Sequence, residues 1–246
     1  MANWNEPRQS QTGFETAQSR GDLAGGVSFD AGLRKHMLSI YNYMASGILL
    51  TGVIALVTAS TGLALTFASG PLMWLVALSP LAIVFAMSFG ANRFSTPTLQ
   101  LMFWGFAVLM GLSLSTIFLV YTGESIAATF FATAGAFAGL SLFGYTTKKD
   151  LSGMGTFLVM GVIGLIIAMV INMFMQSSTM ALVISFIGVL IFAGLTAYDT
   201  QRLKREYQVV QGTEFAGKAI IMGALSLYLD FINMFLFLLR FMGSRE

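Results

Sequence analysis

Apolar and polar residues alternate in long blocks along this chain, and each apolar block is as long as a membrane-spanning helix. Seven apolar segments follow one another, at approximately 38–67, 72–92, 98–121, 125–145, 155–175, 179–199 and 216–242. Each of them is about long enough to cross roughly 30 Å of hydrocarbon as a helix. The connections are short, and several contain turn-forming residues. The pattern predicts an all-α integral membrane protein with seven transmembrane helices.

The composition agrees with a membrane protein and excludes several kinds of chemistry. Of the 246 residues, 56% are hydrophobic and 10% are charged, against about 25% charged in soluble domains. Cysteine is absent, which excludes disulfides, thiol catalysis and cysteine-ligated metals. The single histidine, His36, precedes the first apolar segment, so we expect no His-clustered metal site within the membrane. We expect neither an enzyme nor a bound cofactor.

The polar start of the chain differs from the rest. Residues 1–36 carry scattered charges of both signs and no apolar core, so we expect a mostly disordered tail and not a cleavable secretory signal. Residues 37–243 would form one seven-helix transmembrane domain.

Cations are distributed unequally between the two sides of the predicted bundle. Only Arg240 and Arg245 fall on one side, and the positive-inside rule therefore predicts a cytoplasmic N-terminus and an external C-terminus. The cations on the other side are Arg8, Arg20, Arg34, Lys35, Arg93, Lys148, Lys149, Arg202, Lys204, Arg205 and Lys218.

One carboxylate, Asp230, lies well inside the seventh apolar segment, in the sequence LSLYLDFINMF. A charge at bilayer depth costs at least about 2.5–3.5 kcal/mol, so such a residue usually faces a protein interior, a water-filled cavity or a partner. Ser226, Asp230 and Asn233 follow the i, i+4, i+7 spacing, which places a polar stripe on one face of the last helix. A second acid, Asp199, closes the sixth segment, on the face that also carries Thr196.

Both acids also have purely structural explanations. Asp199 is three residues from Arg202, and the two could form a simple surface pair on the helix. Asp230 could be a lone protonated acid that hydrogen-bonds between helices. The two carboxyls can meet only if Asp199 lies below the membrane interface, or if the seventh helix begins with an interfacial stretch. If they meet in a low dielectric they would share a proton, which would make a proton sensor possible.

Glycine is frequent, with 26 residues, and GAFAG at 135–139 has the small-xxx-small spacing of closely packed membrane helices. We interpret this motif as a helix-packing surface.

Two stretches near the C-terminus, GVLIFAGLTAYDTQRLK (188–204) and ALSLYLDFINMFLFLLRFMG (224–243), resemble the signatures of the transmembrane Bax inhibitor motif family. The segment RKHMLSIYNYMASGILLTG (34–52) is similar to the entry of its bacterial members. The resemblance covers residues from about 30 to 243. It implies six helices in two three-helix layers around a central C-terminal helix, so that Asp230 would be surrounded by protein.

The resemblance also implies a function, that of a pH-sensitive calcium leak channel. The two family aspartates map onto Asp199 and Asp230, and a second-helix arginine that latches the pore maps onto Arg93. We hypothesise that ionised Asp199 pairs with Arg93 in a closed state, and that Arg202 matters little. An acidic residue in the second helix of a bacterial relative corresponds here to Ala82. Any calcium site at the two aspartates would be weak and transient, because calcium prefers six to eight oxygens.

Other functions remain open at this point. A regulatory membrane protein could bind a membrane-bound protease or another partner through its cationic segments. An intramembrane aspartyl protease would explain the paired aspartates, but Asp230 follows LYL and not a Gly-x-Gly motif. The expected partners are the lipid bilayer, calcium ions and protons, and we expect no nucleic acid. The resemblance implies a bacterial inner membrane.

Overall fold

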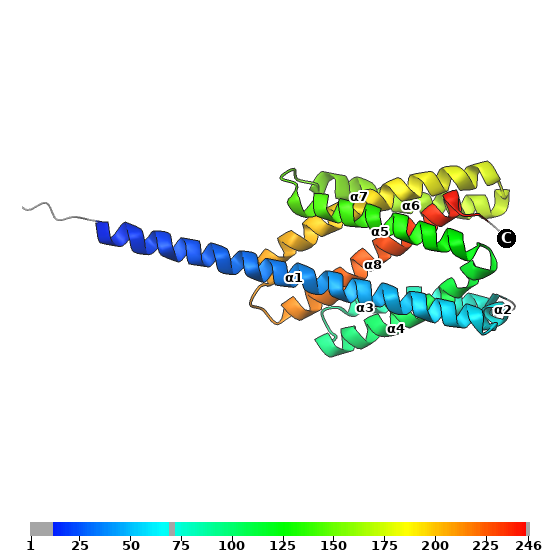
Figure 1. Ribbon diagram of the computed structural model, residues 1–246, viewed down its shortest axis with the longest axis horizontal. Coiled ribbons are helices and arrows are strands. Elements are labelled where there is room, and N and C mark those ends of the chain that lie inside the picture. Colours follow the sequence, from blue (N-terminus) through cyan, green and yellow to red (C-terminus); the bar gives the residue numbers. More distant parts are fainter. Residues whose placement is uncertain (1–11, 69–71, 245–246) are drawn as a thin grey trace, which may run out of the picture.

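The structure is a computed structural model that describes residues 12–68 and 72–244, with side chains described for 31–67 and 72–244 (Figure 1). The described chain is helical and contains no strand. Its elements are α1 (Thr12–Ser60), α2 (Leu63–Ala68), α3 (Leu72–Gly90), α4 (Thr96–Leu114), the 3-10 helix η1 (Ser115–Leu119), α5 (Gly123–Thr146), α6 (Ser152–Met175), α7 (Ser178–Val210) and α8 (Phe215–Met242).

The seven predicted spans are confirmed: the described residues contain seven helices that are long and apolar enough to cross a membrane. Two of their boundaries differ from the prediction. The first span ends at Ser60, and a short separate helix, α2, follows it. The sixth span does not end at Asp199, because α7 continues to Val210 through TQRLKREYQVV. This stretch is rich in helix-forming Gln, Arg, Lys and Glu, which extend a helix into water as readily as apolar residues extend it through lipid.

The N-terminal part of α1 projects away from the bundle (Figure 1). Its backbone is helical from Thr12 and continues without a break into the first span. The predicted tail, 1–36, lies partly outside the described residues, and the division of the chain into a tail and a domain from residue 37 stays a prediction.

The last helix is the most enclosed part of the bundle. Of the 18 residues in the most apolar stretch of α8, 67% are buried. In every other described span the corresponding share is 33% or less. It packs against α1, α4, α5 and α7, whereas α1 and α3 pack on α4, and α5 and α6 pack on α7. Figure 1 shows α8 running between these two groups. The arrangement in two three-helix layers stays an expectation from the resemblance.

A buried polar contact joins α8 to the first group of helices. The hydroxyl of Tyr228, which is fully buried, lies 2.6 Å from Oγ1 of Thr51 on α1. Thr51 in turn donates to the carbonyl of Ala107 on α4, at 2.8 Å. Because the Thr51 proton is used in that bond, Tyr228 is the donor to Thr51. The chain of hydrogen bonds fixes three helices at one depth in the bundle.

Close helix packing occurs at glycines other than the predicted ones. Gly111 of α4 lies against the backbone of α1, and Gly144 of α5 lies against the backbone of α7, so a side chain at either position would meet main-chain atoms. Gly135 and Gly139 of the GAFAG motif are exposed and have open space beside them. The predicted packing role of GAFAG is therefore wrong in this chain, because that face of α5 points away from the other described helices.

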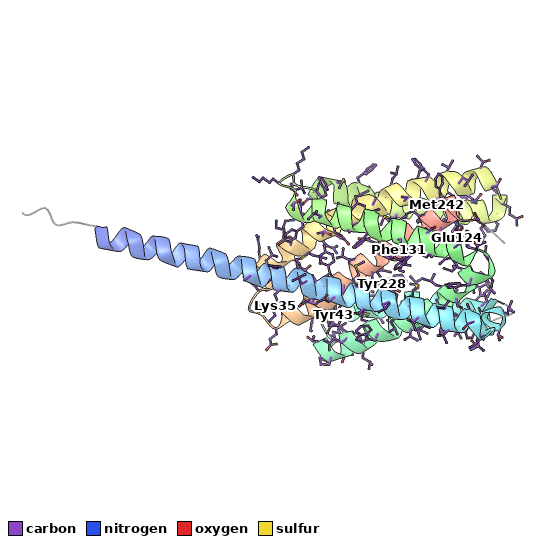
Figure 2. All side chains as sticks on the ribbon, in the orientation of Figure 1. Lys35, Tyr43, Glu124, Phe131, Tyr228 and Met242 are labelled. Atoms are coloured by element: carbon purple, nitrogen blue, oxygen red, sulfur yellow. The ribbon has the colours of Figure 1, made fainter. Side chains whose placement is uncertain are left out.

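The two ends of the bundle differ in charge. The end from which α1 projects carries Lys35, and the opposite end carries Glu124 and Met242 (Figure 2). We call the first of these the cationic end. The described cations that lie there are Arg34, Lys35, Arg93, Lys148, Lys149, Arg202, Lys204, Arg205 and Lys218.

Candidate functional site

The two aspartates lie on neighbouring antiparallel helices, α7 and α8, which residues 211–214 join. Arg202 of α7 donates to Oγ of Ser226 of α8 at 2.9 Å, which fixes the register of the pair. Three residues back along α7 from Arg202 is Asp199, and four residues on along α8 from Ser226 is Asp230. Since the helices run in opposite directions, these steps lead the same way, and the two acids lie at nearly the same level. They are close enough to interact electrostatically.

The extension of α7 explains how this meeting is possible. Asp199 is not a helix terminus at the membrane surface, because α7 continues beyond it for 11 residues to Val210. Asp230 correspondingly lies 15 residues after the start of α8 at Phe215. The long cationic ends of both helices therefore place the two carboxyls well inside the bundle.

Asp199 has a cation and a hydroxyl beside it. Its Oδ2 lies 3.3 Å from Nη2 of Arg202, one turn along the same helix. The Asp199 side chain is 9% exposed and that of Arg202 is 44% exposed, so the pair joins a buried anion to a half-exposed cation. The hydroxyl of Ser226, which accepts a hydrogen bond from the same guanidinium, lies near the Asp199 carboxyl. The surface-pair explanation of Asp199 is thus right about the partner, but the carboxylate itself is buried.

Asp230 differs from Asp199 in having an unpartnered oxygen. The residue is 5% exposed, and its Oδ2 is buried without a hydrogen-bond partner. It lies at the edge of a cavity of about 370 Å³, between α6, α7 and α8. The rest of the cavity wall is mostly apolar, with Leu165 and Met169 from α6 and Phe192 from α7. An ionised carboxylate in such a place has no hydrogen-bond donor of its own, and burial of this kind is costly.

Of the other polar residues predicted for the site, those of the stripe on α8 lie with Asp230 and Thr196 of α7 does not. Ser226 and Asn233 line the same cavity as Asp230. The side-chain amide of Asn233 donates to the Leu229 carbonyl of its own helix, at 2.8 Å. Thr196 is buried, but its hydroxyl donates to the Phe192 carbonyl of its own helix, at 2.8 Å. Thr196 is not among the residues that line the cavity.

The structure does not bring Arg93 to Asp199. Arg93 lies exposed in the turn between α3 and α4, and it takes part in neither of the two ion pairs formed by the described side chains. Those pairs join Arg202 to Asp199 and Arg205 to Asp150. Ala82, at the position that is acidic in a bacterial relative, is exposed on α3.

Three residues of α7, at or next to the site, have contacts beyond those that the sequence predicted. Arg202 interacts electrostatically with both aspartates, and half-buried Glu206 interacts with Arg202 and Asp199. Gln201, also buried, accepts a hydrogen bond from the Leu151 amide at 2.9 Å and donates to the Lys149 carbonyl at 2.8 Å. Gln201 therefore holds the α5–α6 turn against α7. Arg202 and Glu206 follow Asp199 by three and seven residues, a helical spacing that would have found them, whereas no such spacing marks Gln201.

The arrangement can hold a proton more readily than a metal. One guanidinium faces two buried carboxyls. If both carboxyls were ionised, the guanidinium would balance one negative charge, and a proton would be needed to neutralise the second. Among the described residues, no group of three or more His, Asp or Glu side chains gathers as metal ligands. Two carboxyls and the neighbouring amide and hydroxyl oxygens would have to rely on water to complete a calcium shell.

The fold and the site define a helical, multi-pass membrane protein with a pair of buried carboxyls at its central helix. Comparison with known sequences gives its family. The sequence profile of the family Bax1-I, "Inhibitor of apoptosis-promoting Bax1", matches residues 33–246, and the chain belongs to this family.

Several bacterial proteins are similar to this chain over nearly their whole length. An uncharacterised protein of Rickettsia prowazekii is 46% identical over 221 residues, which are 89% of this chain and 93% of the relative. A protein of Caulobacter vibrioides is 47% identical over 231 residues, with 89% and 92% covered. The inner membrane protein YbhL of Escherichia coli is 42% identical over 220 residues, with 88% and 94% covered. The names of these relatives include no enzymatic activity.

Proposed function

We propose that this protein is a passive cation leak of the membrane, permeable to calcium, which protons gate through Asp199 and Asp230. The observation that carries the proposal is the buried, unpartnered Oδ2 of Asp230, a residue that lines a cavity of about 370 Å³. An acid that served packing alone would be expected to use both of its oxygens in hydrogen bonds. Intramembrane ionisable residues of this kind commonly mark ion or proton pathways.

The gate works through charge balance. In the described conformation Arg202 balances one carboxylate, and one proton on the pair neutralises the second. Acidification protonates Asp199 and so removes the anion that faces Arg202. The contacts of Arg202 with Asp199 and with Ser226 are then weakened. Opening is therefore favoured as the pH falls. The charged groups that face this pair are Arg202 and Glu206 of α7, whereas α6 contributes apolar side chains to the cavity.

Arg93 stays a prediction as a latch. The ion pair of Asp199 with Arg202 supports Arg202 as the stabilising cation in the described conformation. A pairing of Asp199 with Arg93 would require a different arrangement of the α3–α4 turn.

The permeant calcium ion binds weakly in this proposal. Two carboxyls offer fewer oxygens than calcium prefers, and the ion keeps part of its water. Weak binding suits permeation, because an ion must leave the site as readily as it enters.

A second candidate function is regulation of a membrane partner, without transport. The observation that favours it is the N-terminal part of α1, which projects beyond the bundle (Figure 1). Together with the charged end of α7, this segment offers a surface at the cationic end for a membrane-bound protease or another protein.

The inner membrane is the proposed location, because the similar Escherichia coli protein is named as an inner membrane protein. The cationic end faces the cytoplasm in this proposal. Because the chain has no cysteine, single cysteines introduced at Lys149 and at Glu124 report the two sides separately. A membrane-impermeant thiol reagent added outside intact cells should label Glu124→Cys and not Lys149→Cys, and the reverse pattern would invert the orientation.

Reconstitution separates the two functions. Purified protein alone, in liposomes loaded with a calcium-sensitive dye, should pass calcium faster than empty liposomes, and faster at pH 6 than at pH 8. A chain that only regulates a partner would leave the flux at the level of empty liposomes under both conditions.

A further inference from the structure

A cavity of about 570 Å³ lies away from the aspartates, between α1 and α5. One face of α1 and one face of α5 line it at helical spacing, and these two helices are not among the closely packed pairs. Met37, Met44 and Phe137 form a buried floor, while Leu38 and Leu142 at the sides are 50% and 64% exposed. The cavity is therefore a groove that opens sideways, toward the hydrocarbon of the bilayer. We call it the α1–α5 groove.

One end of the α1–α5 groove carries positive charge. Arg34 of α1 lines it, and so does Tyr145 of α5. Lys204 of α7 donates to the Tyr145 carbonyl at 2.9 Å, and its Nζ lies 4.9 Å from the Tyr145 ring centroid. Within the part of the chain whose side chains are described, neither Arg34 nor Lys204 belongs to an ion pair. The apolar groove thus has one cation, Arg34, in its wall at the cationic end, and a second, Lys204, beside the wall residue Tyr145.

The length of the groove along α1 matches the hydrocarbon thickness of one leaflet of a bilayer. Along α1 it runs from Arg34 to Ala45, which is about 16 Å at 1.5 Å per residue. One leaflet contributes about 15 Å of hydrocarbon. Tyr41 lies in the groove, two turns along α1 from Arg34, with its hydroxyl 3.5 Å from Oγ1 of Thr200 on α7. Arg34 and Lys204 both lie closer to the cationic end than this contact does, at the level expected for lipid headgroups.

We propose that the α1–α5 groove binds one anionic glycerophospholipid, with an acyl chain along the groove and its phosphate at Arg34 and Lys204. Basic pockets between transmembrane helices bind anionic headgroups in this way. A zwitterionic lipid would bring its own ammonium group next to the two cations, so an anionic headgroup such as phosphatidylglycerol fits better.

A second copy of the chain fits the groove less well. All copies of a membrane protein have the same orientation, so the cationic end of a neighbour would lie beside Arg34 and Lys204. An anionic lipid instead supplies the missing negative charge, and it fills the gap between two helices that pack little on each other.

The headgroup contact can be measured on the full-length protein in detergent, by native mass spectrometry with added phosphatidylglycerol or phosphatidylcholine. Phosphatidylglycerol should bind more tightly. Arg34→Gln and Lys204→Gln should each weaken its binding about fivefold, the effect expected for one basic residue near a lipid surface. Lys218→Gln is the matched control, because Lys218 lies at the same end but away from the groove: it donates to the carbonyl of Asn92, in the α3–α4 turn, which does not line the groove. Equal binding of the two lipids, or wild-type binding by both groove variants, would overturn the proposal.

The acyl-chain contact needs a separate measurement, because a bulky substitution could also disturb folding. Ala138 lines the groove, whereas Ala136 is exposed two residues away, on another face of α5. A fluorophore on Ala138→Cys should be quenched by phosphatidylglycerol with brominated acyl chains more strongly than one on Ala136→Cys, in bilayers of phosphatidylcholine. Equal quenching at both positions would mean that the brominated chains act from the surrounding bilayer and not from the groove. Disulfide-linked dimers through Ala138→Cys that exclude the lipid would show a second copy in the groove, and either result would contradict the lipid site.

Discussion

The guanidinium of Arg202 lies 3.3 Å from the carboxyl of Asp199, one turn along α7, and it also donates to Ser226 of α8. A single cation therefore joins the helix of one buried acid to the helix of the other. This relationship changes the expected role of Arg202, because the sequence alone suggested Arg93 as the cation that stabilises Asp199.

Replacement of Arg202 should open the proposed leak at high pH. Arg202→Ala removes the cation from Asp199 and the bond to Ser226, so the closed conformation loses part of its stability. Ion pairs with a half-exposed partner contribute about 0.5–1 kcal/mol, which corresponds to a two- to fivefold increase in calcium flux at pH 8. Flux into dye-loaded liposomes measures the change.

Arg93→Ala serves as the comparison in the same assay. It removes an exposed cation from the same end of the bundle, where Arg93 takes part in neither ion pair of the described side chains. It should conduct as the wild type does. If Arg93→Ala leaks at pH 8 and Arg202→Ala stays closed, the closed state depends on Arg93 and not on Arg202.

Asp230→Asn should flatten the pH response of the flux while the protein still inserts and folds. The amide has the size of the carboxyl and removes the titrating proton, and Oδ2 makes no described hydrogen bond that the substitution would break. The ratio of calcium flux at pH 6 to that at pH 8 is the quantity to compare. Asn233→Ala is a control from the same cavity wall that carries no proton to titrate, and it should keep the wild-type ratio. A wild-type ratio in Asp230→Asn would remove Asp230 from the sensor.

The buried hydrogen bonds of Tyr228 predict an order of stabilities. Tyr228→Phe keeps the ring in place and leaves Thr51 bonded to the Ala107 carbonyl, so it should cost about 1 kcal/mol, the net value of one hydrogen bond. Thr51→Val removes the acceptor of the Tyr228 hydroxyl, and a buried donor without a partner costs about 1–3 kcal/mol.

Thermal unfolding in detergent should therefore rank wild type above Tyr228→Phe and Tyr228→Phe above Thr51→Val. Tyr43→Phe, which removes a half-buried hydroxyl bonded to Gln100, should change the melting temperature less than either. The reverse order of the two core variants would show that the Tyr228 hydroxyl finds another acceptor.

The sequence predicted the number of spans and the polar face of α8, because both follow from local spacing of apolar and polar residues. It also placed Asp199 and Asp230 on consecutive helices. It did not predict how the two carboxyls come together. A span predicted from hydropathy ends where charged residues begin, whereas α7 continues as a helix through such residues to Val210. For the same reason the sequence offered the Asp199–Arg202 pair only as a surface contact, whereas the carboxylate is buried.

Contacts between distant helices were harder to predict. The GAFAG glycines have the spacing of a packing motif, but spacing does not tell whether a face points to another helix or to lipid. Tyr228 and Thr51 are far apart in the sequence, and nothing in either local pattern pairs them. Only the packing of α8 between α1 and α4 brings the two hydroxyls together.

Asp150, in the turn between α5 and α6, should stabilise the protein in a pH-dependent way. Hydrogen bonds from Ser152, and then the contact with Arg205 at 2.7 Å, lower the pKa of Asp150 to about 2. Because the pKa is lower in the folded state than in the unfolded state, the stabilisation is fully present above the unfolded pKa, near 4, and is lost as the pH falls toward 2. Asp150→Asn should therefore lower the melting temperature slightly at pH 7, and the difference from wild type should shrink between pH 4 and pH 2. A difference that stays constant down to pH 2 would mean that Asp150 acts through the shape of the turn and not through its charge.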